Sequence, residues 1–194
     1  MFVCKDLILQ DKMIKVADKS LLLLKKRLFE YLVFLLEQWK NEIGATGNLT
    51  KLRLQKILFF AVSINATDDT HPLLDIFNRF FAMPYGPVEL DIYECMKTNR
   101  FDNIHFDGIE CKTDVKNFDV SSMNCSIKQE MDKAVQALKD IGFDYINAPV
   151  FSLVEITHKW SAWKVAMDIS KISGSRQEPM TTKDICNSVI KAFS

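Results

Sequence analysis

Histidine and cysteine are the residue types in this chain that could most readily perform catalysis or bind a metal. The three histidines are His71, His105 and His158, and the five cysteines lie at positions 4, 95, 111, 125 and 186. A nucleophile and its base can come from remote parts of a sequence, but the spacing here selects no Cys–His pair. A hydrolase-type site with His158 as acid or base, beside a cysteine or carboxylate, is therefore one alternative to be tested.

Local motifs for catalysis and for cofactor binding are missing from the sequence. It contains no G-x-G-x-x-G, no P-loop, no G-x-S-x-G and no H-E-x-x-H segment. The cysteines form no C-x-x-C or C-x-x-x-C pair, and the acidic residues do not cluster with histidine as metal ligands do. We therefore expect a protein that is not an enzyme and that has no cofactor and no metal site.

The segment 81–93, FAMPYGPVELDIY, has the most unusual composition in the chain. The whole sequence has only 6 glycines and 5 prolines, yet Pro84, Gly86 and Pro87 stand together around Tyr85. Proline favours extended geometry in the residue before it and is well tolerated as the first residue of a helix. We therefore expect an extended approach, a sharp bend, and a helix that begins at Pro87 and runs to about residue 98.

Tyr85 is not explained by the bend itself. A tyrosine at a rigid turn is either an anchor packed into the core with its hydroxyl bonded, or part of a recognition surface. We expect the core anchor and keep the surface as the alternative. If the anchor is correct, Tyr85→Ala destabilises the fold and Tyr85→Phe does so less, because phenylalanine retains most of the buried area.

The segment 51–64, KLRLQKILFFAVSI, predicts a helix that is buried on all sides, because its apolar residues go around the whole helix. Thr50 suits its N-cap. The polar exceptions are Arg53, Gln55 and Lys56. Either they lie at a wetter N-terminal end, which we expect, or Gln55 or Lys56 is held by a partner carboxylate or carbonyl, since an unpaired buried charge is costly.

Apolar residues at helical spacing predict the other helices. They cover residues 18–43, a short stretch from 73 followed by an extended piece to 83, residues 126–141 with Ser126 as N-cap, 152–158 opened by an S-x-x-E capping box, 160–167, and a last helix from Thr181 or Thr182 to Phe193. Residues 100–123 lose this spacing and carry turn residues at 107–108, which predicts a small β-hairpin or extended segment. The expected fold class is therefore mainly α, a compact single-domain bundle of six or seven helices over residues 1–194.

Composition and charge narrow the class of protein further. Apolar residues make up 48% and charged residues 26% of the chain, and the formal net charge is zero. Residues 1–60 carry 11 Lys and Arg against 6 Asp and Glu, but the run Lys25-Lys26-Arg27 is more simply interpreted as a solvated helix face than as a nucleic-acid patch. The odd cysteine count and the lack of a long apolar run favour a cytoplasmic protein without a membrane segment.

Three segments together resemble the Panacea domain, also called the SocA-like antitoxin domain. They are LRLQKILFFA (52–61), AMPYGPVELDIYE (82–94) and LVEITHKWSAWK (153–164), in the order and approximate separation typical of that family. The resemblance covers about residues 28–168, which would leave helical extensions at both ends. Matched to the family pattern, the candidate residues for partner binding or for the structure are Gln55, Lys56, Tyr85, Gly86, Pro87, Val88, Tyr93, His158 and Trp163. Met83 departs from the pattern, which usually has Trp there.

The resemblance implies a non-catalytic antitoxin that neutralises a protein toxin by binding it directly. A prophage or mobile-element protein of the same fold, with a host protein as its target, is the first alternative. A DNA-binding regulator is the second, although the helix at 51–64 is too apolar to lie in a DNA groove and nucleic acid is therefore disfavoured. The oligomeric state and the identity of the target are left open.

Overall fold

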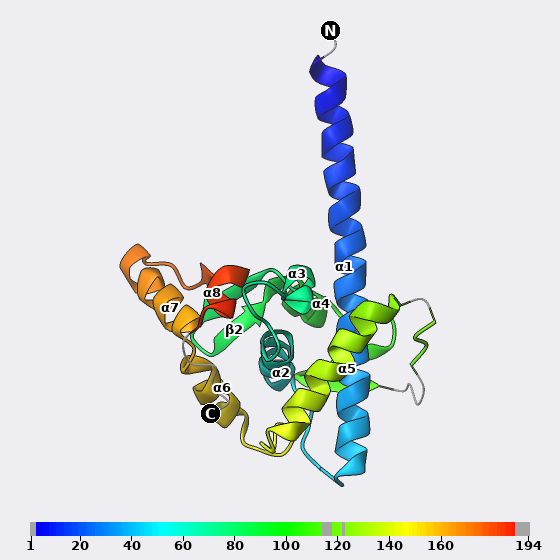
Figure 1. Cartoon of the computed structure of the whole chain (residues 1–194), viewed down its shortest axis with the longest axis vertical. Helices are drawn as coiled ribbons and strands as arrows, with labels where there is room; N and C mark the ends of the chain where they lie inside the picture. Colours follow the sequence, from blue (N-terminus) through cyan, green and yellow to red (C-terminus); the bar gives the residue numbers. More distant parts are fainter. Residues whose placement is uncertain (1–2, 114–117, 122, 189–194) are drawn as a thin grey trace.

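The structure is a computed structural model that describes residues 3–113, 118–121 and 123–188 (Figure 1). Its helices are α1 (Val3–Glu42), α2 (Lys51–Ser63), α3 (Pro72–Ile76), α4 (Leu90–Thr98), α5 (Cys125–Asp140), α6 (Val150–His158), α7 (Ser161–Ser173) and α8 (Thr182–Cys186). The mainly α class is confirmed, with eight helices in the described part of the chain where six or seven were expected.

Five short strands in the described residues form two small sheets among these helices. The first sheet has the order β2-β1-β5, with β1 (Phe80–Met83), β2 (Gly86–Glu89) and β5 (Glu178–Pro179). The second is a hairpin of β3 (Ile104–Asp107) and β4 (Glu110–Thr113). The hairpin expected within residues 100–123 is thus confirmed; residues 114–117 and 122 of that range lie outside the described part.

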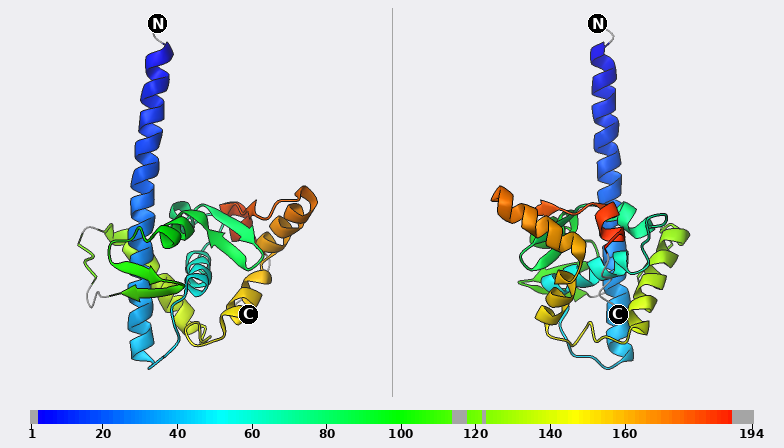
Figure 2. Two further views of the ribbon diagram at one scale, coloured as in Figure 1. Left: turned by 180° about the vertical axis from the view of Figure 1, so that it is seen from behind. Right: turned by 60° about the vertical axis from the view of Figure 1, so that its left-hand side comes forward.

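The helix α1 is longer than the one expected at residues 18–43. Its C-terminal half packs against α4 and α5, and Leu28, Leu32 and Leu36 are fully buried there. Its N-terminal part projects well away from the other elements (Figures 1 and 2). The expected compact bundle therefore describes the body of the molecule but not this projecting part of α1.

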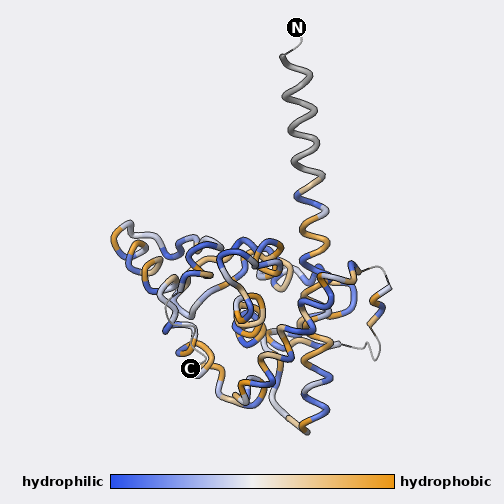
Figure 3. Tube along the Cα trace, in the orientation of Figure 1, coloured by the Kyte–Doolittle hydropathy of each residue, from blue (hydrophilic) through white to orange (hydrophobic). Residues whose placement is uncertain are grey.

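The helix α2 lies at the centre of the body, as its all-round apolar composition predicted (Figure 3). The hydroxyl of Thr50 accepts a hydrogen bond from the backbone N–H of Arg53, which confirms Thr50 as the N-cap. Phe59 lies edge-on to Phe80 of β1, with ring centroids 5.4 Å apart, and to Trp160, at 4.9 Å. These aromatic contacts fix β1 and the α6–α7 junction to the central helix.

The segment around Pro87 departs from its prediction. Pro87 does not open a helix but lies in β2, which pairs antiparallel with β1 so that Met83 faces Gly86 and Phe80 faces Glu89. The helix α4 begins at Leu90, because the Glu89 carboxylate accepts a hydrogen bond from the N–H of Ile92 and serves as the N-cap. The bend at PYGP is therefore the turn of a β-hairpin.

Two other predicted helix starts are wrong and one is confirmed. Ser152 lies inside α6, which starts at Val150 after Pro149, so its capping box does not form. Asn124, not Ser126, caps α5. Thr181 does cap α8, in a capping box with Asp184. The last helix ends at Cys186 rather than Phe193, and residues 189–194 lie outside the described part.

Candidate functional site

The β1–β2 turn, residues 83–86, carries the exposed part of the family-like segment. Tyr85 is 59% exposed at this turn, so the expectation of a core anchor is wrong, and the alternative of a recognition surface stays a prediction. Its ring lies edge-on to that of Phe151 at the start of α6, with centroids 6.1 Å apart. Phe151 is itself 58% exposed, and together the two rings form an exposed aromatic pair.

Gly86 ends the turn in a conformation that few other residues adopt. Its φ is +90°, in the region where a side chain is strained. A Cβ placed on it would lie 2.3 Å from Oγ1 of Thr157 and 3.0 Å from Nζ of Lys56. The start of β2 therefore touches both α6 and α2, and only glycine allows so close an approach.

Lys56 of α2 is hydrogen-bonded to Pro87, the next residue of β2. Its side chain is fully buried, and Nζ donates a hydrogen bond of 2.7 Å to the carbonyl oxygen of Pro87. Burial lowers the pKa of Lys56 from 10.5 to about 7. The interpretation that this lysine sits at a wetter helix end is wrong, and the alternative, a lysine held by a carbonyl, is correct.

Gln55 of α2 is hydrogen-bonded to Glu89, the last residue of the same strand. Its Oε1 accepts a hydrogen bond from the N–H of Glu89 at 2.9 Å, and its Nε2 lies 3.4 Å from the Glu89 carbonyl oxygen. The side chain is buried, as is that of Arg53, whose guanidinium donates to the carbonyl oxygens of Tyr145 and Ala148. All three polar exceptions in α2 are thus buried and bonded to backbone groups.

His158 and Trp163 approach the turn from the α6–α7 junction. The indole Nε1 of Trp163 donates a hydrogen bond of 3.0 Å to the carbonyl oxygen of Met83. The His158 ring stacks on the Trp163 ring, with centroids 3.7 Å apart and planes 11° from parallel. Burial and then the charge of Lys56 lower the pKa of His158, and a hydrogen bond to the Pro84 carbonyl acts in the opposite direction.

The two remaining candidate residues do not contribute to the exposed surface in the same way. Val88 is buried within β2. Tyr93 lies in α4, where the Lys97 ammonium sits 5.1 Å from the centre of its ring. The structure therefore gathers Gln55, Lys56, Gly86, Pro87, Val88, His158 and Trp163 around the hairpin, exposes Tyr85, and leaves Tyr93 on the helix that follows.

Two features of this region were not predicted from the sequence. Phe151 carried no signal beyond its position after Pro149. Lys25 was interpreted as part of a solvated face, yet it is fully buried and its Nζ contacts Glu89 at 2.7 Å and Asp91 at 2.6 Å. A signal existed, because Lys25 follows Leu21 by four positions and precedes Leu28 by three, on the apolar stripe.

Lys25 is the central cation of a polar network at the C-terminal end of β2. The Glu89 carboxylate is fully buried, and burial raises its pKa while Lys25 lowers it. Asp91 also pairs with Arg79, and Asn78 accepts a third hydrogen bond from Lys25. A cleft of about 680 Å³ opens beside this network, lined by Asp18, Lys19, Leu21, Leu22, Lys25, Asn78, Arg79 and Asp91.

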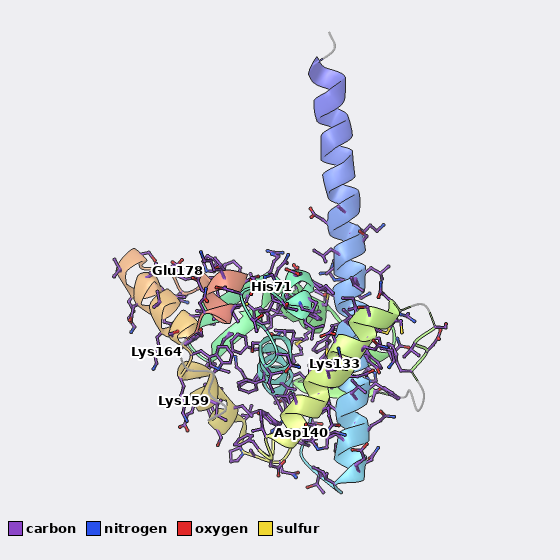
Figure 4. All side chains as sticks on the ribbon, viewed as in Figure 1. His71, Lys133, Asp140, Lys159, Lys164 and Glu178 are labelled. Carbon is purple, nitrogen blue, oxygen red and sulfur yellow. The ribbon has the colours of Figure 1, made fainter. Side chains whose placement is uncertain are left out.

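The histidines and cysteines do not come together. His71 stands at the start of α3 and contacts Asp75 (Figure 4). His105 is exposed on β3, and His158 is the last residue of α6, where it stacks on Trp163. Cys95, Cys111 and Cys125 are free thiols. Among the described residues, no group of three or more His, Cys, Asp or Glu side chains could hold a metal ion.

The fold and the turn define a mainly helical domain in which a buried central helix holds a short hairpin with an exposed aromatic tip. A family model described as antitoxin SocA-like, Panacea domain, matches residues 54–164. The match covers more than half of the chain and includes every candidate residue, and the chain belongs to this family. Searches of curated proteins and of solved structures found no match. Within the described residues, no helix has the length and apolar character needed to span a membrane.

Proposed function

We propose that this chain is a cytoplasmic antitoxin that neutralises a protein toxin by binding it directly, without catalysis. The observation that carries the proposal is the exposed aromatic pair of Tyr85, on the β1–β2 turn, and Phe151, at the start of α6, which are 59% and 58% accessible. Aromatic residues dominate the energetics of protein interfaces because they bury a large area at a small cost in conformational entropy. Membership of a family named for an antitoxin supports the same function.

The proposed contact surface has an apolar centre and a polar edge. Tyr85 and Phe151 supply the centre, and the exposed lysines Lys159 and Lys164 lie at the outer side of the α6–α7 junction (Figure 4). An apolar core within a polar rim is the usual anatomy of a protein interface. A stable complex needs an interface on the order of 1,200–2,000 Å² in total, so the toxin would also cover neighbouring parts of α6 and α7.

The basic run Lys25-Lys26-Arg27, on which the nucleic-acid alternative depends, is occupied by contacts within the protein. Lys25 is buried against Glu89, and the Lys26 ammonium lies 3.8 Å from Asp102. Arg27 donates to the carbonyl oxygen of Asp119 at 2.7 Å. Since phosphate binding requires cations free to displace counterions, this run is poorly suited to DNA.

The surroundings of His158 argue against the hydrolase alternative. His158 stacks on Trp163 and its burial and the nearby Lys56 lower its pKa. A general base must reach the proton that it removes, and this imidazole is covered on one face by an indole ring. We assign His158 a structural role in the turn.

Co-expression with the product of a neighbouring gene tests the proposed function. We expect one adjacent gene to encode a protein that stops growth alone and not together with this chain. Tyr85→Ala should lose the rescue while keeping the wild-type melting temperature, because the ring is exposed and its removal leaves no cavity. Tyr85→Phe should keep most of the rescue, since only the hydroxyl is lost.

Ile109→Ala is the matched control, because Ile109 is 67% exposed at the β3–β4 turn, away from the proposed surface. It should rescue like the wild type. A toxic neighbour that Tyr85→Ala and the wild type neutralise equally would contradict the proposed surface. If no neighbouring gene is toxic, and a purified host protein binds this chain instead, the phage or mobile-element alternative takes its place.

A further inference from the structure

We infer that Trp163, His158 and Lys56 are positioning residues, which hold the β1–β2 turn so that Tyr85 is presented beside Phe151 at the centre of the contact. This inference rests on the proposed function for its consequence, but the hold itself is a property of the free protein. It divides the family-like residues into a group that shapes the turn and a tip that meets the partner.

The hold consists of side-chain donors that bond the backbone carbonyls on both sides of Tyr85. Trp163 Nε1 bonds the carbonyl oxygen of Met83 at 3.0 Å, and Lys56 Nζ bonds that of Pro87 at 2.7 Å. The His158 ring supports Trp163 from behind, stacked on the indole with centroids 3.7 Å apart. Because a carbonyl carries no side-chain identity, these bonds can hold a turn whose exposed residue varies.

The donors come from elements that are far apart in the sequence and are themselves fixed. Lys56 is in the central helix α2, whereas His158 ends α6 and Trp163 lies in α7. The stacking of His158 on Trp163, at 3.7 Å, makes the two act as one unit. The turn is thus held from two sides, against α2 and against the α6–α7 junction.

A turn held in this way lowers the entropy that binding would otherwise lose. Ordering a flexible loop on binding reduces affinity, and a loop already in its bound geometry avoids that reduction. The chemistry of the tip then defines the partner's site, which we infer to be an apolar pocket able to admit a tyrosine ring. The wall of this pocket would rest on Phe151.

The first experiment measures the hold without any partner. Trp163→Phe removes the Nε1 donor but keeps a ring for His158 to stack on, and Lys56→Met removes the ammonium from a site that can accept an apolar chain. We expect amide hydrogen exchange of residues 82–86 to become at least about tenfold faster in both variants. Exchange in the core of α5 should change much less, which separates a local release from a global loss of stability.

Unchanged exchange of residues 82–86 in both variants overturns the hold, whatever the partner turns out to be. Val165→Ala is the matched control, because Val165 lies in α7 two residues after Trp163 and is 60% exposed. It should leave exchange of the turn as in the wild type. Faster exchange in this control as well would also overturn the assignment, because it would make the effect one of α7 as a whole.

The second experiment uses the purified product of the neighbouring toxic gene. If Trp163→Phe leaves the turn ordered for only about one-tenth of the time, the dissociation constant rises about tenfold. We expect this loss to come through slower association, and the loss in Tyr85→Ala to come through faster dissociation. Faster exchange of the turn in Trp163→Phe together with wild-type affinity would show a hold with no role in recognition, and would overturn the positioning role while leaving the antitoxin function intact.

Discussion

At the scale of the residue, Lys56 gives the protein an unusual dependence of stability on pH. Burial lowers its pKa to about 7 in the folded state from 10.5. Between these values the unfolded chain binds the extra proton, so the contribution of this group to stability rises with pH and its penalty is greatest below pH 7. This is opposite in sign to a lysine paired with a carboxylate.

We predict that Lys56→Met changes the free energy of unfolding relative to the wild type in a pH-dependent way. As pH falls from 8.5 toward 6.5, the free energy of unfolding of the variant should rise relative to that of the wild type, by at most about 1.4 kcal/mol per pH unit. Urea unfolding at several pH values checks this, because Cys95 and Cys111, whose pKa values are raised by burial, are common to both proteins. A difference that is constant over this range would mean that Lys56 remains charged in the folded state.

Gly86 offers a second test at the same scale. Gly86→Ala places a Cβ at φ +90° and 2.3 Å from Thr157, so both backbone strain and overpacking oppose it. We predict a loss of roughly 2–5 kcal/mol in the free energy of unfolding, the sum of the two effects.

Gly108→Ala is the control for backbone strain, because Gly108 also has a positive φ, +58°, and its added Cβ would meet nothing within 4 Å. It should cost about 1 kcal/mol, from the strain alone. Equal losses in the two variants, measured by chemical denaturation, would show that β2 can move away from α6 and that the close approach is not required.

At the scale of the element, apolar spacing and turn residues predicted the helices and the hairpin whose stability depends on residues close together in the sequence. The central helix α2 with its Thr50 cap and the β3–β4 hairpin were predicted correctly, because their apolar spacing and turn residues act within a short stretch of chain. The first sheet was missed, since β5 has two residues and pairs with β1 across almost a hundred positions. Pro87 looked like a helix start because nothing near it reveals that Lys56 bonds its carbonyl.

The same division applies to the candidate site. Resemblance to a family selected Lys56, Tyr85 and Trp163, but their roles depend on contacts such as Trp163 with Met83, which no local pattern contains. The interpretation of Tyr85 as an anchor failed because hydrophobic area alone does not say which side of a turn faces the core. Burial of Lys25, by contrast, could have been predicted from its place on the apolar stripe of α1.

The junction between α1 and β2 depends on the buried pair of Lys25 and Glu89. We predict that Lys25→Met lowers the free energy of unfolding by about 3–5 kcal/mol, because it leaves the Glu89 carboxylate buried without its counter-ion. Adding Glu89→Gln should recover much of the loss, since glutamine is neutral and can still accept from the N–H of Ile92. Additive losses in the double variant, measured by denaturant unfolding, would show that the two charges do not interact.

At the scale of the whole molecule, the hairpin tip and the projecting part of α1 extend from one helical body. The hairpin tip with Tyr85 lies at one side, and the projecting part of α1 leaves the body at another (Figure 2). The family match, residues 54–164, covers the hairpin together with Lys56, His158 and Trp163, but not α1 or β5.

The Lys25–Glu89 pair also has a consequence for the order in which the protein is made. Lys25 leaves the ribosome 64 residues before Glu89 and 66 before Asp91, its two carboxylate partners. At synthesis rates of about 5–20 residues per second, α1 must wait roughly 3–13 s before its lysine can be neutralised. During that interval the apolar stripe around Lys25 keeps a charged, hydrated interruption, which would disfavour premature burial against the wrong segment until β2 has emerged.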